Sequence, residues 1–458
     1  MTEYIDKIKE IINRQGGNPL CCVHSFGCQQ NVSDGERIMG LLSDCGYGIT
    51  NDPNEAALVL YNTCAVRENA ENKVYGMLGE LKHLKEKNPE LIIGLCGCMA
   101  QEEKTVEKVH STYRQVDLIF GTHALSELPK LLYEVLTEHK FVYDKDKHCD
   151  PEGITAFRQT KFKAGVPIMY GCDNFCSYCI VPYVRGREKS RASEEILCEI
   201  KNLAESGCKE IMLLGQNVNS YGKGLDENIN FSELLRRINA LDGGFRVRFM
   251  SPHPKDCTPE LIDTILECDK ICKHLHLPLQ SGSDEILRRM NRRYTAEKYM
   301  ETVDYVRSKV PDFSLTTDII VGFPNETRED FLKTMEIVEK VKYDNIYSFI
   351  YSKRSGTKAA EMPDSISGEE KSSRMTELLA AQRRISTEHY KRFLGRELNV
   401  LFDSESRHDG LVTGKSDEFI IVEAEGGKEL IGQKKRVKIT ETFNWAVKGE
   451  IIYQEVLL

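Results

Sequence analysis

Three cysteines in the spacing Cys-x3-Cys-x2-Cys, namely Cys172, Cys176 and Cys179, constrain this chain more than any other feature of its sequence. Three thiols this close cannot all form disulfides with one another, because one is always left over, so the spacing indicates a metal centre. Cysteine is the usual ligand of iron–sulfur clusters, and three thiolates leave one iron of a 4Fe-4S cluster open. Zinc is the alternative, but a structural zinc site takes four ligands, and the next cysteine, Cys198, lies in a predicted helix.

Length and composition restrict the class of protein. A chain of 458 residues corresponds to about three domains. No apolar run is long enough to cross a bilayer, and residues 1–17 lack the apolar region of a secretion signal and are too acidic for a transit peptide. Sixteen cysteines in a chain without a secretion signal favour reduced thiols and bound metal over disulfides. We therefore expect a cytoplasmic protein without a membrane partner.

Before residue 145, apolar runs alternate with helical patterns. The predicted strands are 20–25, 56–61, 91–96 and 116–120, and the predicted helices are 31–42, 67–86 and 125–137. Strands that alternate with helices pair in parallel, so the pattern predicts a doubly wound α/β domain at 19–145, after an N-terminal extension at 1–18. Residues 146–160 lack periodicity and are predicted to be a linker.

Three of the predicted strand ends carry a cysteine. Cys28 follows the first strand, Cys64 the second and Cys98 the third. The carboxyl ends of the strands in an open α/β sheet lie on one edge, where ligands bind, so these cysteines are predicted to converge. Gly27 and Gly97 precede two of them and allow the backbone to approach a bulky ligand closely. The alternative is three separate buried cysteines, which the recurrence of the same position disfavours.

Six further strand and helix units are predicted at 161–393. The strands are 166–170, 210–214, 246–250, 273–277, 315–321 and 345–351, and helical patterns include 193–206, 231–241 and 328–341. Six units predict a partial (β/α)6 barrel, short of the eight that close, with chemistry at the carboxyl ends of the strands. The three-cysteine motif lies at such an end. We expect polar residues at other strand ends to face a cofactor or a substrate: Gln216, Ser251, Gln280 and Asp318.

The last part of the chain, 394–458, consists of short β runs. They are 398–402, 410–413, 419–422, 435–439 and 448–456, and five such strands predict a small antiparallel β-barrel. Small barrels of this kind often bind single-stranded nucleic acid, here through the basic residues Lys434, Lys435, Arg436 and Lys438. Because the net charge is −9, any RNA contact must depend on such local patches. A helical pattern at 369–393 is a second candidate RNA surface or, equally, a solvated face.

The motifs resemble known protein families at two levels. Cys172, Cys176 and Cys179, with Tyr178 before the third cysteine, resemble the radical S-adenosylmethionine superfamily. That resemblance implies that the cofactor binds the open iron and is cleaved reductively to a 5'-deoxyadenosyl radical. The three predicted parts together resemble the methylthiotransferase family, which has an N-terminal cluster domain, a radical barrel and a C-terminal TRAM domain. This second resemblance covers essentially the whole chain after Leu20.

Within that family, several segments resemble the members that act on an isopentenylated adenosine of tRNA. The segments are 62–70, 97–101, 181–191, 276–282 and 351–357. Two positions depart from the family pattern. Gln30 stands where the family often has methionine, and Ser355 stands where it commonly has proline. Neither departure removes a predicted ligand.

The resemblance implies a second 4Fe-4S cluster on Cys28, Cys64 and Cys98. It also implies the reaction, in which a methylthio group is added to C2 of N6-isopentenyladenosine next to the anticodon. One S-adenosylmethionine would methylate a sulfur on the second cluster, and another would supply the radical. The implied partners are a tRNA anticodon stem-loop, an electron donor such as flavodoxin or ferredoxin, and iron–sulfur carrier proteins. The enzyme is expected to be a monomer. Candidates for stacking on the target base are Tyr178, Tyr183, Phe323 and Tyr351.

Three other functions are compatible with the motifs. Related methylthiotransferases modify a threonylcarbamoyl-adenosine of tRNA or an aspartate of a ribosomal protein. The segment 65–69 is the feature that favours the isopentenyl substrate. A non-catalytic cluster carrier or RNA-binding protein is a third alternative, which the complete set of Cys172, Cys176 and Cys179 argues against.

Overall fold

The N-terminal part of the chain forms a parallel sheet in the order β2-β1-β3-β4-β5-β6. The structure is a computed structural model that describes residues 1–65, 68–145 and 153–453. The strands are β1 (Leu20–Ser25), β2 (Gly48–Ile49), β3 (Leu58–Thr63), β4 (Ile92–Gly97), β5 (Leu118–Phe120) and β6 (Val142–Asp144). The predicted strands are present close to their expected positions. The sequence does not predict β2 or β6, which are too short to show a period.

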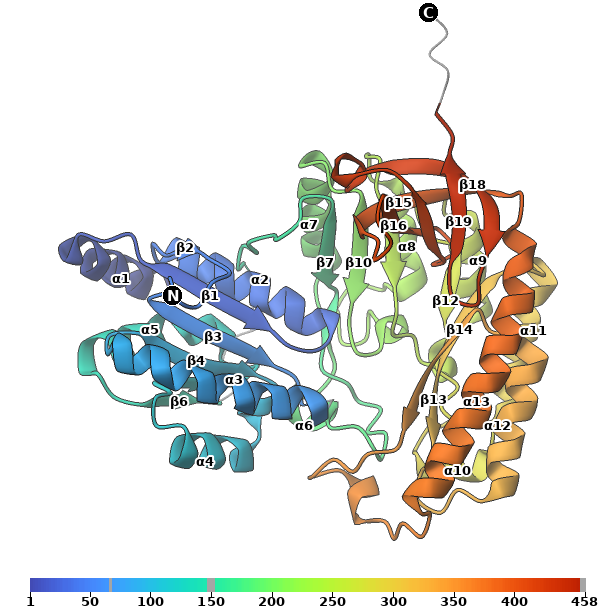
Figure 1. Ribbon diagram of the computed structural model, residues 1–458, viewed down its shortest axis with the longest axis horizontal. Helices are drawn as coiled ribbons and strands as arrows, with labels where there is room; N and C mark the ends of the chain where they lie inside the picture. Colours follow the sequence, from blue (N-terminus) through green and yellow to red (C-terminus); the bar gives the residue numbers. More distant parts are fainter. Residues whose placement is uncertain (66–67, 146–152, 454–458) are drawn as a thin grey trace, which may run out of the picture. The chain divides into compact units, whose positions relative to one another are not determined.

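Helices cover both faces of this sheet (Figure 1). The helices are α1 (Thr2–Gln15), α2 (Gln29–Asp44), α3 (Glu68–Lys87), α4 (Glu103–Thr112) and α5 (Leu128–Glu138). Buried residues of α1, α2 and α5 pack on one face of the sheet, and those of α3 and α4 on the other. Helix α1 belongs to this layer because Ile5, Ile8 and Ile12 form one buried stripe at helical spacing. The doubly wound fold is thus confirmed.

The second compact unit contains the predicted partial barrel. Its parallel strands are β7 (Lys163–Pro167), β10 (Glu210–Leu214), β11 (Arg246–Phe249), β12 (His274–His276), β13 (Ser314–Val321) and β14 (Asn345–Ile350). They pair in the orders β7-β10-β11 and β12-β13-β14, and a bridge between Val247 and Ile271 joins the two sets. No pairing closes β14 onto β7 within the part of the chain that the structure describes. The open six-stranded barrel is therefore confirmed.

Helices surround the strands of this barrel and bury its apolar core. They are α7 (Ser193–Glu205), α8 (Phe231–Ala240), α9 (Pro259–Glu267), α10 (Asp284–Arg289), α11 (Ala296–Lys309), α12 (Arg328–Val341) and α13 (Gly368–His389). The short strands β8 (Met169–Tyr170) and β9 (Lys189–Ser190) form a separate antiparallel pair. Tyr170 lies directly before the loop with the three-cysteine motif. This places the motif beyond the carboxyl end of β7, as the sequence predicts.

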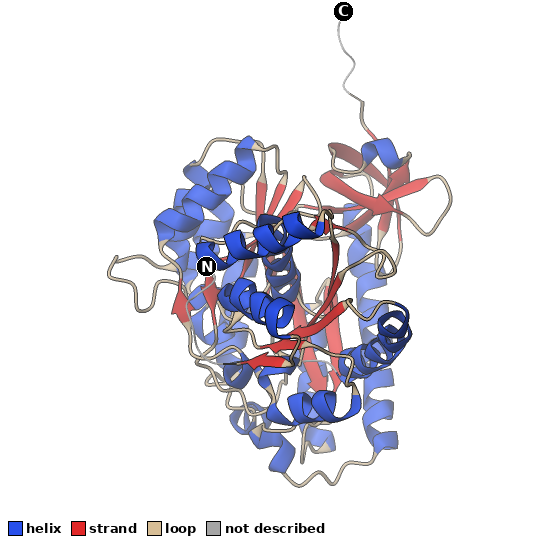
Figure 2. Cartoon of the chain, turned by 90° about the vertical axis from the view of Figure 1, so that its left-hand side faces the viewer, coloured by secondary structure: helices blue, strands red, loops and turns tan. Residues whose placement is uncertain are grey.

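The C-terminal residues form a closed barrel in the order β15-β16-β17-β19-β18. Its strands are β15 (Glu397–Glu405), β16 (Leu411–Ser416), β17 (Ile421–Glu425), β18 (Lys434–Thr442) and β19 (Val447–Ile451), drawn in red at the upper right of Figure 2. The barrel is not wholly antiparallel as predicted, because β17 and β19 pair in parallel. The end of the last predicted strand, 454–456, lies outside the described residues.

A buried network of ion pairs connects the C-terminal barrel (the small barrel) to the open six-stranded barrel. Glu210 on β10 binds Arg246 and Arg248 on β11, at 2.8 and 2.7 Å. Arg246 also binds Asp417 of the small barrel at 2.9 Å, and Arg248 donates to the carbonyl of Ser416. Glu210 and Arg246 are the first residues of β10 and β11, so the small barrel covers the end opposite to the three-cysteine motif.

One segment of the chain packs apart from its sequence neighbours. The first unit comprises Met1–Gln159 together with Ile180–Arg187, and the second comprises Thr160–Cys179 and Glu188–Leu458. Ile180–Arg187 contains the one-turn helix α6 (Val181–Val184). It therefore belongs to the first unit although its sequence lies inside the predicted 161–393 domain. Among the helices that the structure describes, none is long and apolar enough to span a membrane.

Candidate functional site: two cysteine centres

Cys28, Cys64 and Cys98 come together at the carboxyl edge of the first sheet. Cys28 precedes α2, Cys64 follows β3 and Cys98 follows β4. Because β1, β3 and β4 are neighbours in the sheet, the three loops are adjacent. The amide of Cys98 donates to the carbonyl of Thr63, the residue before Cys64, at 2.9 Å. The convergence expected from the strand ends is present in the structure.

Two glycines allow these loops to approach one another. Gly27 has φ 128, and a Cβ there would lie 2.3 Å from Cβ of Cys64. Gly97 has φ 90, and its Cβ would lie 2.5 Å from the carbonyl oxygen of Thr63. L side chains rarely adopt such backbone angles, and neither position has room for one. Both glycines are therefore required for the close packing of the cysteine loops.

Two asparagines fix the geometry of this site. Sγ of Cys28 lies 3.1 Å from Oδ1 of Asn31, and Nδ2 of Asn31 donates to the carbonyl of Thr63 at 2.8 Å. Nδ2 of Asn62 donates to the carbonyl of Asn31 at 2.6 Å. Asn31 and Asn62 are both fully buried. They hold the start of α2 against the loop that carries Cys64.

The electrostatic environment favours a thiolate at Cys28. A hydrogen bond from Cys64 is the largest influence, and with the nearby charge of Arg185 it lowers the Cys28 pKa to about 6, against the opposing effect of burial. Burial raises the pKa of Cys98, while the charge of Arg185 and a hydrogen bond from it act in the opposite direction. Thiolates are the form that binds metal, so the site combines metal-binding chemistry with a buried cation.

Arg185 is the functional residue of this site that sequence reasoning missed. Its guanidinium donates to Asp34 at 2.8 Å, and both side chains are almost fully buried. The surrounding segment is anchored to the first unit, where Ile180 and Val184 pack with Cys98 and Ala65. A basic residue in an unassigned loop carries no local signal. The hint in the sequence is that Arg185 lies in the segment 181–191, which is among those that resemble the methylthiotransferase family.

The site does not have the geometry of a single-ion centre. No group of three or more His, Cys, Asp or Glu side chains among the described residues is arranged to hold one metal ion. The thiolates of a 4Fe-4S cluster bind three different irons and therefore stand further apart than the ligands of one ion. This arrangement is compatible with a cluster.

The second cysteine centre is a loop held in a strained conformation. Cys172 and Cys176 are buried and Cys179 is partly exposed. Phe175 takes the left-handed conformation, with φ 47, and Nδ2 of Asn291 donates to the carbonyls of Asn174 and Phe175 at 3.1 and 2.9 Å. A non-glycine residue with positive φ between two candidate ligands marks a constrained site.

A buried arginine also contacts this loop. Nη1 of Arg292 donates to Sγ of Cys176 at 3.4 Å, and Nη2 donates to the carbonyl of Pro278 at 3.3 Å. Nε of Arg292 donates to the hydroxyl of Tyr294, which in turn donates to the carbonyl of Leu279 at 2.8 Å. Arg292 therefore ties the cysteine loop to the strand end that carries Gln280. Sequence reasoning missed this residue as well.

The four polar residues predicted at strand ends fall into two pairs. Ser251 donates from its hydroxyl to the carbonyl of Gly215, next to Gln216. The amide of Gln280 donates to the carbonyl of Asp318 at 2.8 Å, and Gln280 itself takes a left-handed φ of 65. Oδ2 of Asp318 lies 3.4 Å from Nε2 of His276. Gln216, Ser251 and Gln280 follow the carboxyl ends of β10, β11 and β12, as predicted, whereas Asp318 lies within β13, which continues to Val321.

Several buried polar atoms near this centre lack a partner. Oε1 of Gln216, the hydroxyl of Ser177 and the hydroxyl of Tyr351 have no hydrogen bond among the residues that the structure describes. Burying a polar group without a hydrogen bond is costly, so such atoms point to a bound ligand. S-adenosylmethionine, which offers many donors and acceptors, fits this set.

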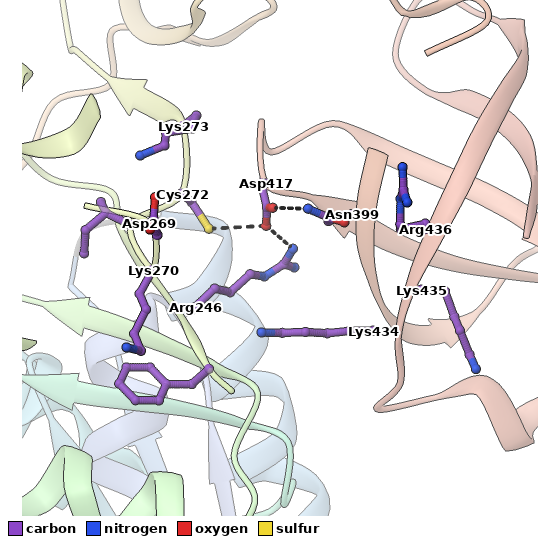
Figure 3. Close-up of a pocket in the computed structure, with 12 residues that line it drawn as sticks. Arg246, Asp269, Lys270, Cys272, Lys273, Asn399, Asp417, Lys434, Lys435 and Arg436 are labelled. Carbon is purple, nitrogen blue, oxygen red and sulfur yellow. Dashed lines mark hydrogen bonds and ion pairs between the residues drawn. The ribbon is translucent and has the colours of Figure 1, made fainter. Parts of the chain in front are cut away.

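Three of the four predicted RNA-binding residues line a cavity, and the fourth, Lys438, does not. Lys434 donates to the carbonyl of Gly244 at 2.7 Å, and burial and the charge of Arg246 lower its pKa. It lines a cavity of about 330 Å³ between the two barrels, with Arg246 and Asp417 (Figure 3). Arg436 pairs with Glu397, and Lys438 is exposed. The cavity has six basic side chains and two carboxylates in its walls: Arg246, Lys270, Lys273, Lys434, Lys435, Arg436, Asp269 and Asp417.

Three family models match successive parts of the chain. The model of the Radical SAM superfamily matches residues 166–338, that of the TRAM domain matches 391–452, and that of Uncharacterized protein family UPF0004 matches 21–121. The range 21–121 includes Cys28, Cys64 and Cys98. Of the segment 62–70, residues 66 and 67 lie outside the described residues.

Curated relatives match over almost their whole length. A tRNA-2-methylthio-N(6)-dimethylallyladenosine synthase of Acetivibrio thermocellus is 48% identical over 457 residues, which cover 98% of this chain and 95% of that protein. The proteins of the same name from Thermoanaerobacter pseudethanolicus and Clostridioides difficile are 48% and 47% identical. They cover 97% and 98% of this chain, and 95% and 96% of their own length is matched.

Solved structures share the fold at low identity. The radical S-adenosylmethionine methyltransferase TsrM of Kitasatospora setae, with cobalamin and a 4Fe-4S cluster bound, superposes with a TM-score of 0.54 at 13% identity. That match covers 87% of this chain and 81% of the other. The cobalamin-dependent radical enzyme OxsB gives a TM-score of 0.54 at 12% identity, over 83% of this chain and 57% of the other. These likenesses show the fold alone.

Proposed function

Since this chain belongs to the radical S-adenosylmethionine methylthiotransferase family, that of the tRNA-2-methylthio-N(6)-dimethylallyladenosine synthases, we propose that it adds a methylthio group to C2 of N6-isopentenyladenosine next to the tRNA anticodon. The observation that carries this proposal is that a chain matched over its full length keeps two separate cysteine triads, each with a buried arginine beside it. One triad suits radical generation and the other suits a sulfur donor.

The first cofactor site consists of Cys172, Cys176 and Cys179. They would hold a 4Fe-4S cluster whose open iron binds S-adenosylmethionine, while Cys28, Cys64 and Cys98 would hold a second cluster. When bound, these groups supply the radical that activates the C2–H bond and the sulfur and methyl that replace it. The chain supplies shielding, orientation and fixed charge around them.

Polar strand ends of the open barrel would orient S-adenosylmethionine. We assign this role to Gln216, Ser251, Gln280 and Asp318. The partnerless Oε1 of Gln216 supports it, because that acceptor is buried at the carboxyl end of β10. The left-handed backbone of Gln280 also supports it, since strain of this kind is concentrated at functional sites. Both observations concern the same end of the barrel as the cysteine loop.

The small barrel would contribute to tRNA binding. Lys434, Lys435, Arg436 and Lys438 are the proposed phosphate contacts. The excess of basic side chains in the cavity of Figure 3 supports this role. The ammonium groups of Lys434 and Lys270 donate hydrogen bonds to neutral carbonyl oxygens rather than to carboxylates. A phosphate could therefore be attracted there despite the overall negative charge of the chain.

The remaining features of the proposal concern the cellular context. The enzyme works as a monomer in the cytoplasm. It receives electrons from a flavodoxin or ferredoxin, and it receives its clusters from iron–sulfur carrier proteins. Reducing the first cluster needs a low-potential donor, which supports the choice of partner. The proposed domain limits are 1–18, 19–145, 161–393 and 394–458, with a linker at 146–160. The structure gives one qualification, since Ile180–Arg187 packs with the first part.

Two single-cysteine variants test the proposal. Cys172→Ala should abolish formation of 5'-deoxyadenosine and leave the iron of the N-terminal cluster in place. Cys64→Ala should still cleave S-adenosylmethionine but yield no methylthio product. Both are measured after anaerobic reconstitution, by iron and sulfide counts and by chromatography of the products. Loss of all iron in Cys172→Ala, or unchanged product in Cys64→Ala, would contradict the assignment.

The substrate is tested in cells. Mass spectrometry of digested tRNA from a strain that lacks this gene should show isopentenyladenosine without the methylthio group, and the intact gene should restore it. Retained methylthio-isopentenyladenosine in the deletion strain would reject the substrate. Loss of a methylthiolated threonylcarbamoyl-adenosine, or of the ribosomal aspartate modification, would establish one of the alternatives instead.

A further inference from the structure

We propose that Arg185, clamped by Asp34, is a positioning residue that supplies a fixed positive charge to the cluster and donor sulfur held by Cys28, Cys64 and Cys98. The inference rests on the proposed function of this triad and adds a residue from outside the segment that carries the cysteines. The segment Ile180–Arg187 packs with the first unit and brings the buried guanidinium of Arg185 to the cysteines. This placement is the basis of the inference.

Arg185 is directed at the cysteines rather than at solvent. Its side chain is 8% exposed, and its charge acts on both Cys28 and Cys98. It also hydrogen-bonds to Cys98. A guanidinium has five N–H donors in a rigid plane, so it can bind Asp34 on one side and sulfur on the other.

Asp34 holds the guanidinium in place. Its Oδ2 accepts from Nη2 of Arg185 at 2.8 Å, and its Oδ1 accepts from Nε2 of Gln30 at 3.2 Å. Both oxygens of this carboxylate therefore have a donor, and Asp34 itself lies on α2, the helix that begins after Cys28. The arginine is fixed to the element that also positions a candidate ligand.

The segment around Arg185 is anchored independently of the charge. The hydroxyl of Thr122 donates to the carbonyl of Val184 at 2.6 Å. Gly186 has φ 73, and a Cβ there would lie 3.2 Å from Cε1 of His123. The backbone on both sides of Arg185 thus rests on the loop after β5, so a change of the side chain should leave the segment in place.

A buried anion needs such a cation. A 4Fe-4S cluster with three thiolates carries net negative charge, which increases when the cluster is reduced or binds sulfide. Taking an anion out of water is unfavourable unless a positive charge lies nearby, and arginine stays protonated in any such site. Cluster potentials depend on the net charge and on hydrogen bonds to the sulfurs. Arg185 should therefore raise the potential of this cluster and favour binding of anionic sulfur.

The test isolates the second cluster. In a full chain with Cys172→Ala, Cys176→Ala and Cys179→Ala, any remaining iron belongs to the N-terminal site. Arg185→Gln in this background should shift the reduction equilibrium at least tenfold toward the oxidised form, which is about 59 mV for a one-electron couple. Asp34→Asn should shift it in the opposite direction, because it removes a negative charge. The readout is a potential titration followed by electron paramagnetic resonance.

Controls separate charge from general damage. Arg187→Gln removes the same charge from an exposed residue two positions away and should leave the potential unchanged. Arg185→Lys keeps the positive charge, so its reduction potential should be closer to that of the parent than the potential of Arg185→Gln is. The inference is wrong if Asp34→Asn and Arg185→Gln lower the reduction potential equally. It is also wrong if Arg187→Gln lowers the potential as much as Arg185→Gln does.

The proposed function can fail separately. If the parent with the three alanines binds no iron at all, the assignment of the second cluster fails. If that parent binds a cluster whose potential and sulfide affinity are the same in Arg185→Gln, only the role of Arg185 is rejected. Sulfide affinity is measured by titrating sodium sulfide into the same samples, and Arg185→Gln is expected to weaken it at least tenfold.

Discussion

Gly27 leaves no room for a side chain at the first cysteine site. A Cβ at this position would lie 2.3 Å from Cβ of Cys64 and 3.0 Å from its Sγ, and φ is 128. Gly27→Ala should therefore displace the loop that positions Cys28 and reduce the iron of the N-terminal cluster by more than half. Iron and sulfide counts after reconstitution provide the measurement.

The matched control for that change is Gly76→Ala. Gly76 lies within α3 in open space, and alanine favours helices by about 0.5–1 kcal/mol relative to glycine. Its iron content should equal that of the unaltered chain, and its stability should not fall. Full cluster occupancy in Gly27→Ala would show that the loop tolerates displacement.

Cysteines and arginines differ in how far the sequence reveals them. Cys28, Cys64 and Cys98 could be placed together because each follows a predicted strand of one parallel sheet. Arg185 and Arg292 could not, since their partners Asp34 and Cys176 are distant in the sequence and no periodic pattern connects them. Charged residues in loops are usually solvated, and only tertiary packing distinguishes these two.

Among the structural elements, the β10 and β11 pair attaches the small barrel to the open one. Burial alone would raise the pKa of Glu210, but Arg248, Arg246 and Lys163 lower it to about 2. Glu210→Gln removes the carboxylate that pairs with both buried arginines, and Arg246 then keeps, among the described residues, only its ion pair with Asp417. We expect it to lower the free energy of unfolding by about 3–5 kcal/mol. Chemical denaturation of both proteins at neutral pH measures the difference.

The contribution of Glu210 should depend on pH in a defined direction. Its folded pKa lies below the ordinary value of 4.5, so its stabilising effect is present above that pH. The effect is lost as the pH falls from about 4.5 toward about 2, because over this range the unfolded state binds the proton while the folded state remains ionised. The stability difference between the unaltered chain and Glu210→Gln should shrink over this range. A constant difference would contradict the assignment.

An exposed pair provides the control for that experiment. Glu397 pairs with Arg436 on the surface of the small barrel, where both side chains are solvated. Exposed ion pairs contribute about 0–1 kcal/mol, so Glu397→Gln should change stability little. A loss as large as that of Glu210→Gln would show that the small barrel, rather than the buried network, limits stability.

Helices and strands could be predicted from the sequence where the apolar pattern extends over many residues. The strands of both large sheets show clear apolar runs, and they appear at the expected places. The parallel pairing of β17 with β19 was not predictable, because short alternating strands favour antiparallel neighbours and strand order depends on long-range contacts. Helix α1 was not predicted either, since Ile5, Ile8 and Ile12 are few among many charged residues.

At the scale of the whole molecule, tRNA binding must overcome a net charge of −9. Local phosphate contacts should then dominate the salt dependence. Lys435→Gln and Lys438→Gln should each reduce the slope of log affinity against log salt by about 0.7, the value for one contact to a single strand. Fluorescence anisotropy with a labelled anticodon stem-loop measures the slope. Lys298→Gln, on α11, should leave it unchanged.

The segment Ile180–Arg187 has a practical consequence for protein engineering. It is encoded with the open barrel but packs with the first sheet. A chimera that exchanged the first 159 residues for those of a relative would pair a foreign Asp34 equivalent with the native Arg185. A recombinant fragment that ended at Gln159 would expose the surface that Ile180 and Val184 cover. A chimera that exchanges the first unit for that of a relative must therefore also exchange the eight residues Ile180–Arg187.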